Sequence, residues 1–224
     1  MVAAVLLVLV ATNLLNNVWA PRAHLVVSPV AALLLLGIAR QAGLSWADLG
    51  LGQAAFLSGL RWGAVGGALI TCAYAVGLFV PVVRAAAESS PGAGPAAFSA
   101  LVDVPFGTVL LEEVAFRGVL WAMVAVTRGP WVATAASSLA FGLWHVLPSL
   151  STSVGVRVPA ALADGIVGRT VWVALTVLAT GAAGVVFCEL RRRSGSLLAP
   201  ILVHWALNGV GFGFRVAVDR RIPR

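Results

Sequence analysis

A small set of carboxylate, imidazole and amide side chains lies within otherwise apolar stretches of the chain. These side chains belong to the segments Glu112-Glu113-Val114-Ala115-Phe116-Arg117, Phe141-Gly142-Leu143-Trp144-His145 and His204-Trp205-Ala206-Leu207-Asn208. A carboxylate or an imidazole can act as a general base toward water, and imidazole or carboxamide N–H groups can stabilise an oxyanion. Together these residue types are the equipment for hydrolysis.

The two adjacent glutamates have different expected roles because they point in different directions on a helix. Glu113 precedes Arg117 by four residues, which is the favoured order for a helical ion pair, so we expect these two residues to be supporting structure. Glu112 points about 100° away around the helix and has no cation close by in the sequence. We therefore predict Glu112 as the catalytic carboxylate, acting as a general base in a dry environment.

The number and position of the histidines favour a functional role for two of them. Phe141 and His145 share one helical face, as do His204 and Asn208, because each pair is four residues apart. Taken alone, each histidine is better explained as a hydrogen-bonded core residue. The chain has only three histidines, however, and two of them lie within predicted membrane helices, like the double glutamate. In one helical bundle these groups are each other's nearest polar partners, so the joint pattern favours a shared site.

The amino-acid composition indicates a membrane protein, much of whose surface faces lipid. Hydrophobic residues make up 60% of the 224 and charged residues only 10%, whereas a soluble domain has about 25% charged residues. The apolar stretches are long and unbroken, which favours helices over a β-barrel. The net charge is +7, but the basic residues are all arginines that fall mainly between apolar stretches, where they anchor helix ends. We therefore expect no nucleic-acid partner.

The apolar stretches predict an all-α polytopic transmembrane helical bundle, with the catalytic groups on three helices of its C-terminal half. A spanning helix needs about 20 apolar residues, which predicts about seven spans. They are 2–19, 24–40, 62–83, 99–127, 131–148, 167–190 and 195–217.

The segments between the spans divide the chain into three regions. Residues 1–98 form N-terminal transmembrane helices and a surface segment, 99–217 a catalytic helical core, and 218–224 a basic C-terminal tail. Residues 45–61 have mixed polarity and are expected to lie along the membrane surface. The segments 84–98 and 149–166 are rich in small residues and proline, and we expect loops there.

Two glycine patterns predict close helix packing. Gly63-x-x-x-Gly67 is one, and the run Gly181-Ala182-Ala183-Gly184 is the other. Small residues let two helix backbones approach each other within a membrane. These patterns bear on packing and carry no chemistry.

The three polar motifs, in this order on separate membrane helices, resemble the CAAX-protease and bacteriocin-processing (CPBP, or Abi) family. The resemblance covers about residues 99–212 and does not extend to the first 98 residues. It implies an intramembrane endopeptidase related to the enzyme that removes the last three residues of prenylated proteins. It also implies that Glu112 and His145 activate water, and that His204 and Asn208 bind the oxyanion.

The sequence leaves two versions of this chemistry open. Glu112, His145 and His204 are the donor types of a catalytic zinc site with an open water position. Against zinc, there is no His-Glu-x-x-His motif, each ligand comes from a different helix, and no carboxylate partner of either histidine is evident. We therefore favour a mechanism without a metal cofactor and keep the zinc enzyme as the alternative.

A transporter and a non-catalytic membrane scaffold are the rival functions. Intramembrane carboxylates and histidines also form proton relays, but the inverted repeats typical of many transporters are not evident. The expected partners are the lipid bilayer and a protein or peptide substrate, with a CAAX-like tail, a sorting tail or a leader peptide as candidates. The family and the arginine-only composition favour the inner membrane of a bacterium.

Overall fold

A computed structural model of the chain describes residues 1–87, 89–151 and 165–221. These residues form helices joined by short turns, with no β-strand among them. The main helices are α1 (Val2–Leu14), α2 (His24–Gln41), α3 (Phe56–Gly77), α4 (Pro81–Ala86), α5 (Ala93–Phe98), α6 (Leu110–Glu112), α7 (Trp121–Arg128), α8 (Pro130–Trp144), α9 (Val146–Ser151), α11 (Gly165–Ser194) and α12 (Leu198–Arg221). The all-α prediction is therefore confirmed.

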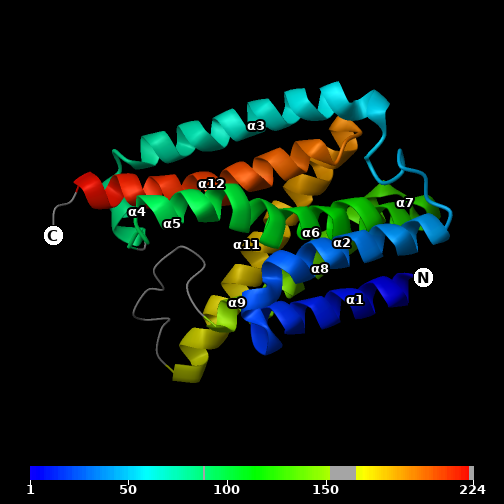
Figure 1. Cartoon of the computed structure of the whole chain (residues 1–224), viewed down its shortest axis with the longest axis horizontal. Coiled ribbons are helices and arrows are strands. Elements are labelled where there is room, and N and C mark those ends of the chain that lie inside the picture. Colours follow the sequence, from blue (N-terminus) through cyan, green and yellow to red (C-terminus); the bar gives the residue numbers. More distant parts are fainter. Residues whose placement is uncertain (88, 152–164, 222–224) are drawn as a thin grey trace.

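The long helices lie side by side, and one of them crosses the others (Figure 1). α3 packs along α12, and α1 packs against α2. Between these two pairs runs a continuous helical segment, residues 93–128, which contains α5, α6 and α7. α11 crosses the bundle obliquely and packs against α8. The 93–128 helix, α8 and α12 carry the polar motifs, so the bundle brings those motifs into its interior.

Five helical segments of the described residues are long and apolar enough to cross a membrane, which makes the chain a multi-pass membrane protein. They are Val2–Trp19, Pro21–Gln41, Gln53–Gly77, Gly165–Ser194 and Leu198–Arg221. The predicted count of about seven is higher for two physical reasons. The predicted span 99–127 contains four ionisable residues, and the predicted span 131–148 is broken, because α8 ends at Trp144 after 15 residues.

Two predicted connecting segments are partly helical. α3 begins at Phe56, so the end of the predicted surface segment 45–61 belongs to a spanning helix. The predicted loop 84–98 contains the end of α4 and all of α5. α5 tolerates Pro95 because proline in the first helical turn removes no hydrogen bond. In the predicted loop 149–166, residues 152–164 lie outside the described residues.

The 93–128 helix contains two wide, π-helical stretches on either side of α6. These stretches are Ser99–Val109 and Glu113–Leu120. Neighbouring helices donate hydrogen bonds to their carbonyls: Ser28 Oγ to Gly107 O at 2.7 Å and Ser137 Oγ to Phe116 O at 2.8 Å. Such π-helical turns are frequent at functional sites. Here they flank the two adjacent glutamates.

Glycines allow close contact where the sequence predicted it. A Cβ on Gly63 would lie 2.6 Å from Leu202 Cδ1, so α3 and α12 approach too closely there for any larger residue. On the other side of the bundle, a Cβ on Gly184 would lie 3.0 Å from Ser138 Cα, where α11 meets α8. Both packing predictions are confirmed, and the contacts fix α8 and α12, which carry the histidines.

The turn between α2 and α3 is held against the junction of α11 and α12. Leu197 N donates to Gly50 O at 2.8 Å, and buried Arg191 donates from Nη2 to Asp48 O at 2.8 Å. A Cβ on Gly50 would lie 2.3 Å from Arg191 Nε, so only glycine fits there. Hydrogen bonds from Ser45 close this turn and hold the pKa of Asp48 below its usual range.

Candidate active site

Glu113 joins an arginine and a histidine in the interior of the bundle. Its Oε1 accepts hydrogen bonds from Arg117 Nη1 at 3.0 Å and from His204 Nδ1 at 2.7 Å. The Glu113 and Arg117 side chains are 0% exposed, and His204 is 4% exposed. The expected ion pair is present. Its carboxylate also holds the imidazole of α12, as carboxylates commonly orient functional histidines.

Glu112 faces the other side of the same imidazole. Its Oε1 accepts a hydrogen bond from Trp144 Nε1 at 2.9 Å, and its Oε2 lies 3.8 Å from His204 Nε2. That separation is too long for a direct hydrogen bond. Within the part of the chain that the structure describes, Glu112 Oε2 accepts no hydrogen bond. The carboxylate is therefore fixed through one oxygen and available for chemistry through the other.

His145 follows directly after the last residue of α8 and is half-buried. Its Nδ1 lies 2.8 Å from Phe141 O. A carbonyl can only accept, so Nδ1 carries the proton and Nε2 of the neutral ring has a free lone pair. The imidazole packs edge-on against the Phe141 ring at 4.7 Å between centroids. His145 is thus held in the tautomer that can accept a proton at Nε2.

Aromatic rings enclose the cluster. Phe187 of α11 stacks on His204 with ring centroids 4.9 Å apart, and Phe141 lies 6.0 Å from the same ring. Arg117 Cζ lies 3.9 Å from the Phe141 centroid and 4.9 Å from that of Phe187, within cation–π range. The Phe141 ring therefore packs against His145, Arg117 and His204. Both histidines lie on this shared ring, and not at opposite faces of the bundle.

Asn208 is the fourth residue of the predicted catalytic set. It lies one helical turn after His204 on α12 and is half-buried. Its helical position gives it the same face as the imidazole.

Three features of the cluster were missed by sequence reasoning. The contacts of Trp144 with Glu112 and of Phe187 with His204 were not predicted. A carboxylate partner was not evident from the sequence for either histidine, but His204 has one in Glu113. Trp144 could have been suspected because it precedes His145, but no local signal links residues 91 positions apart.

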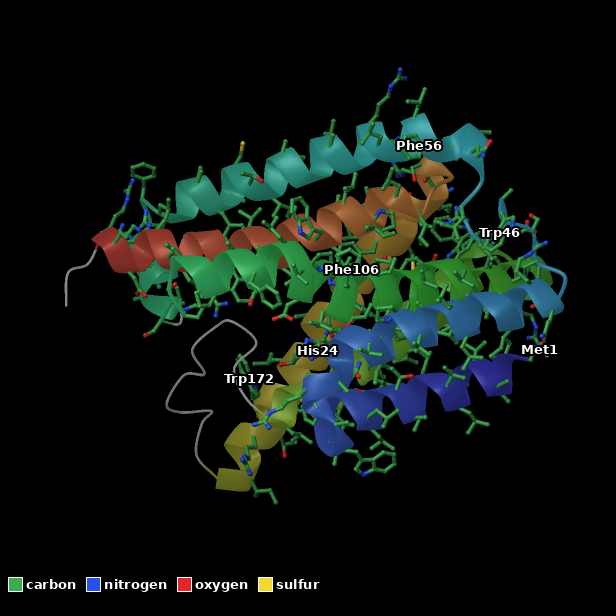
Figure 2. All side chains as sticks on the ribbon, in the orientation of Figure 1. Met1, His24, Trp46, Phe56, Phe106 and Trp172 are labelled. Carbon is green, nitrogen blue, oxygen red and sulfur yellow. The ribbon has the colours of Figure 1, made fainter. Side chains whose placement is uncertain are left out.

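The third histidine makes a separate contact with a carboxylate. His24, labelled at the start of α2 in Figure 2, has its Nε2 3.3 Å from Asp103 Oδ1 on the 93–128 helix. Both side chains are about one-third exposed, at 33% and 32%. Neither residue was assigned a role from the sequence. Asp103 lies nine residues before Glu112 on the same helix.

The donor geometry does not assemble the zinc set that the sequence left open. Among the described residues, no group of three or more His, Cys, Asp and Glu side chains is arranged to hold a metal ion. His204 Nδ1 is bonded to Glu113, which is the kind of carboxylate partner that metal-binding histidines commonly have, so this bond does not count against zinc. The metal-free mechanism stays a prediction, and the chemistry below is derived without a metal ion.

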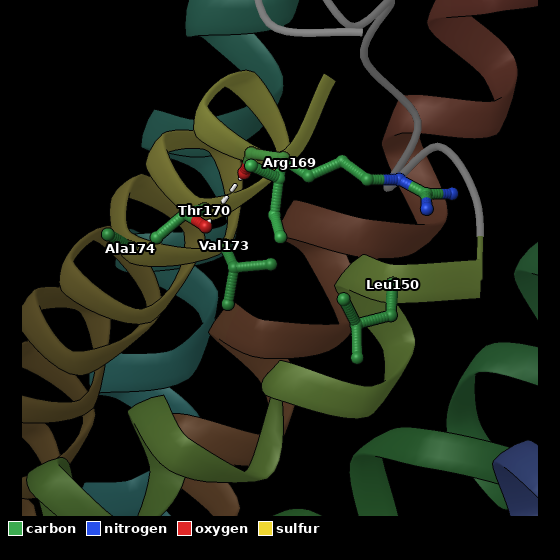
Figure 3. A pocket seen from close by; sticks show the side chains of 6 residues that line it. Leu150, Arg169, Thr170, Val173 and Ala174 are labelled. Atoms are coloured by element: carbon green, nitrogen blue, oxygen red, sulfur yellow. Dashed lines mark hydrogen bonds between the residues drawn. The ribbon is translucent and has the colours of Figure 1, made fainter. Parts of the chain in front are cut away.

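Two cavities described in the structure lie away from the cluster. One, of about 440 Å³, lies between α9 and α11, with Leu150 facing Arg169, Thr170 and Val173 (Figure 3). The other, of about 450 Å³, lies where the turn before α3 meets the start of α12, and its lining includes Phe56 and Leu198. Neither is lined by the predicted site residues.

Comparison with known proteins identifies the family. Residues 94–210, more than half of the chain, match the type II CAAX prenyl endopeptidase Rce1-like family. No curated protein and no solved structure gives a match. The matched region contains all three polar motifs and agrees with the family that those motifs suggested. The chain therefore belongs to the type II CAAX prenyl endopeptidase Rce1-like family.

Proposed function

We propose that the protein is an intramembrane endopeptidase that hydrolyses a peptide bond near the membrane by attack of water. The observation that carries the proposal is the buried carboxylate of Glu112, held by Trp144 through Oε1 while Oε2 faces His204 Nε2 at 3.8 Å. Intramembrane ionisable groups are costly and mark functional sites. The endopeptidase family gives the reaction type.

In this mechanism Glu112 and His145 activate the water. Glu112 Oε2 removes one proton as the water oxygen attacks the scissile carbonyl carbon, and the C–N bond remains intact at this stage. His145 Nε2 accepts a hydrogen bond from the second water proton and so orients the attack. Glu112 then gives its proton to the nitrogen of the leaving amine, and the C–N bond breaks to give a carboxylic acid and an amine. The second water proton, still on the acid, passes to the amine, so that a carboxylate and an ammonium group are released.

His204 and Asn208 stabilise the negative oxygen of the tetrahedral intermediate. His204 donates from Nδ1 to Glu113, and with a proton on Nε2 it also presents a donor to the reaction centre. The Asn208 amide supplies the second N–H.

The substrate class is tested with two peptides that differ only in lipidation. Purified full-length protein in lipid nanodiscs is incubated with a farnesylated peptide ending in a CAAX sequence and with the same peptide without the farnesyl group. Mass spectrometry should detect release of the C-terminal tripeptide, faster from the farnesylated peptide and strongly reduced with Glu112→Gln. Failure to cleave the farnesylated peptide would rule out a CAAX-type substrate and leave sorting tails and leader peptides.

Removing the Asn208 amide should slow turnover without unfolding the protein. Asn208→Ala is expected to lower kcat by about 10²–10³-fold, the usual loss for one oxyanion donor. Because Asn208 is only half-buried, the thermal unfolding of the variant should change little. Unchanged kcat in Asn208→Ala would show that the oxyanion is bound elsewhere.

Chelators should leave the activity intact. Protein dialysed against a strong chelator is expected to cleave the peptide at the untreated rate, because a buried carboxylate and an imidazole can activate water without a metal. Metal analysis should find no stoichiometric zinc. The proposal would be replaced by a metalloprotease mechanism if chelation abolished cleavage, zinc restored it, and Glu112, His145 and His204 were each needed to bind the ion.

A further inference from the structure

The first membrane helix reaches the point where α8 ends. The last carbonyls of a helix have no partner within that helix and need donors from elsewhere. At this end, Phe141 O is bonded by His145 Nδ1 and Gly142 O by His145 N. Trp144 O receives its hydrogen bond from Asn13 Nδ2, at 3.0 Å, 131 residues away in the sequence. Asn13 is thus the donor that caps α8 from outside.

The orientation of the Asn13 amide is fixed in turn by Asn17. Asn17 Nδ2 donates to Asn13 Oδ1 at 2.6 Å and to Asn13 O at 2.9 Å. Because Oδ1 accepts this hydrogen bond, Nδ2 of Asn13 is the atom that faces Trp144 O. The two asparagines lie one turn apart in the last part of the first span. Polar side chains within a membrane span are costly and are commonly functional.

The carbonyl group of Trp144, which Asn13 caps, adjoins two residues that make contacts in the candidate active site. The Trp144 indole holds Glu112 Oε1 at 2.9 Å. The peptide bond that begins at Trp144 O leads directly to His145, whose ring caps Phe141 O at 2.8 Å. The Asn13 amide of α1 therefore fixes the plane of the Trp144–His145 peptide. The Trp144 indole that binds Glu112 extends from one end of this peptide, and the His145 ring extends from the other.

We propose that Asn13 is a positioning residue that sets the geometry of Glu112 and His145 by holding the Trp144–His145 peptide. The proposal rests on the proposed function of those two residues and extends it to α1, which lies outside the family-matched region 94–210. Asn13 itself touches neither water nor substrate in this mechanism. Its loss should let the end of α8 shift and let His145 exchange tautomers.

The histidine content of the chain makes a direct test possible. With three histidines, protein labelled with ¹⁵N-histidine gives three imidazole signal sets, which His→Gln variants assign. In wild type, neutral His145 should show the tautomer protonated at Nδ1. In Asn13→Leu, which removes the amide and keeps a side chain branched at Cγ, His145 should show a mixture of tautomers, while His24 stays unchanged. Asn13→Gln, which keeps a donor, should restore much of the wild-type pattern.

Kinetics with the farnesylated peptide provide the second readout. Asn13→Leu should lower kcat by about 10–10²-fold with little change in KM, as expected for misplaced catalytic groups. Thr12→Val, which changes a buried polar residue in the same turn, is the matched control and should keep wild-type kcat. If Asn13→Leu does not accumulate, Asn17→Ala removes the bonds that orient the amide and should shift both readouts in the same direction.

An unchanged His145 spectrum and unchanged kcat in Asn13→Leu would overturn the positioning role. Loss of thermal stability alone, with the His145 tautomer preserved, would reduce Asn13 to a packing residue and would also overturn it. The ¹⁵N-histidine spectra report the His145 tautomer whether or not the protein cleaves a peptide. A wild-type protein that cleaves no peptide therefore counts against the proposed function, and the spectra still decide the role of Asn13.

Discussion

Replacing Glu112 with Gln should lower peptide cleavage by about 10²–10⁴-fold, the contribution expected of a general base. The amide keeps the size of the side chain and can still accept from Trp144 Nε1 through its oxygen. It cannot take a proton from water at the position of Oε2, which lies 3.8 Å from His204 Nε2. Cleavage rates of purified wild type and variant in nanodiscs measure this effect directly.

Glu189→Gln is the matched control for the Glu112 variant. Glu189 is a carboxylate on a spanning helix as well, but it pairs with Arg192 and Arg193 near the end of α11, and its side chain is 30% exposed. Its replacement should leave the cleavage rate at the wild-type value. Equal rates in wild type and Glu112→Gln would show that this carboxylate is structural.

Replacing Arg117 with Ala should destabilise the fold by about 3–5 kcal/mol, the usual loss when one partner of a buried ion pair is removed. Arg117 and Glu113 are both fully buried, so the remaining carboxylate would lose its guanidinium partner. The contacts of the guanidinium with Phe141 and Phe187 would also be lost. Reversible unfolding in SDS, followed by circular dichroism, gives the change in the free energy of unfolding.

Arg192 is the control for Arg117, because it also forms an ion pair within a helix but is exposed. Arg192 pairs with Glu189 at 2.8 Å, but its side chain is 37% exposed, and exposed pairs of this kind contribute little. Arg192→Ala should therefore unfold close to wild type. An Arg117→Ala protein as stable as wild type but inactive would mean that the guanidinium contacts the substrate, contrary to the supporting role assigned here.

Helical spacing predicted the parts of the site that are local in sequence. Glu113 and Arg117 form the expected ion pair because residues four apart meet on any helix. The separation of Phe141 and His145 likewise predicted their shared face, and the rings do pack against each other. The identity of the polar residues and their apolar surroundings were enough to suggest a buried site and its family.

Contacts between distant segments could not be predicted from the sequence. The bonds of Glu113 to His204 and of Asn13 to Trp144 join residues 91 and 131 positions apart. They depend on which helix faces which, and no local pattern encodes that. Five of the described segments have the length and hydropathy of a spanning helix, where the sequence predicted about seven. Length and hydropathy do not reveal that α8 ends at Trp144, where the imidazole of His145 caps its last turn.

The central claim is that Glu112 makes this protein a peptidase. It is tested most directly by identifying the N- and C-termini of the proteins in the membranes of living cells. Cells carrying wild type or Glu112→Gln in place of the native gene are compared by mass spectrometry of N- and C-terminal peptides, with Glu189→Gln as control. The account predicts a defined set of shortened termini in wild type and in the control, replaced by intact precursors in Glu112→Gln. Identical termini in all three strains would contradict it and favour a scaffold or a transporter.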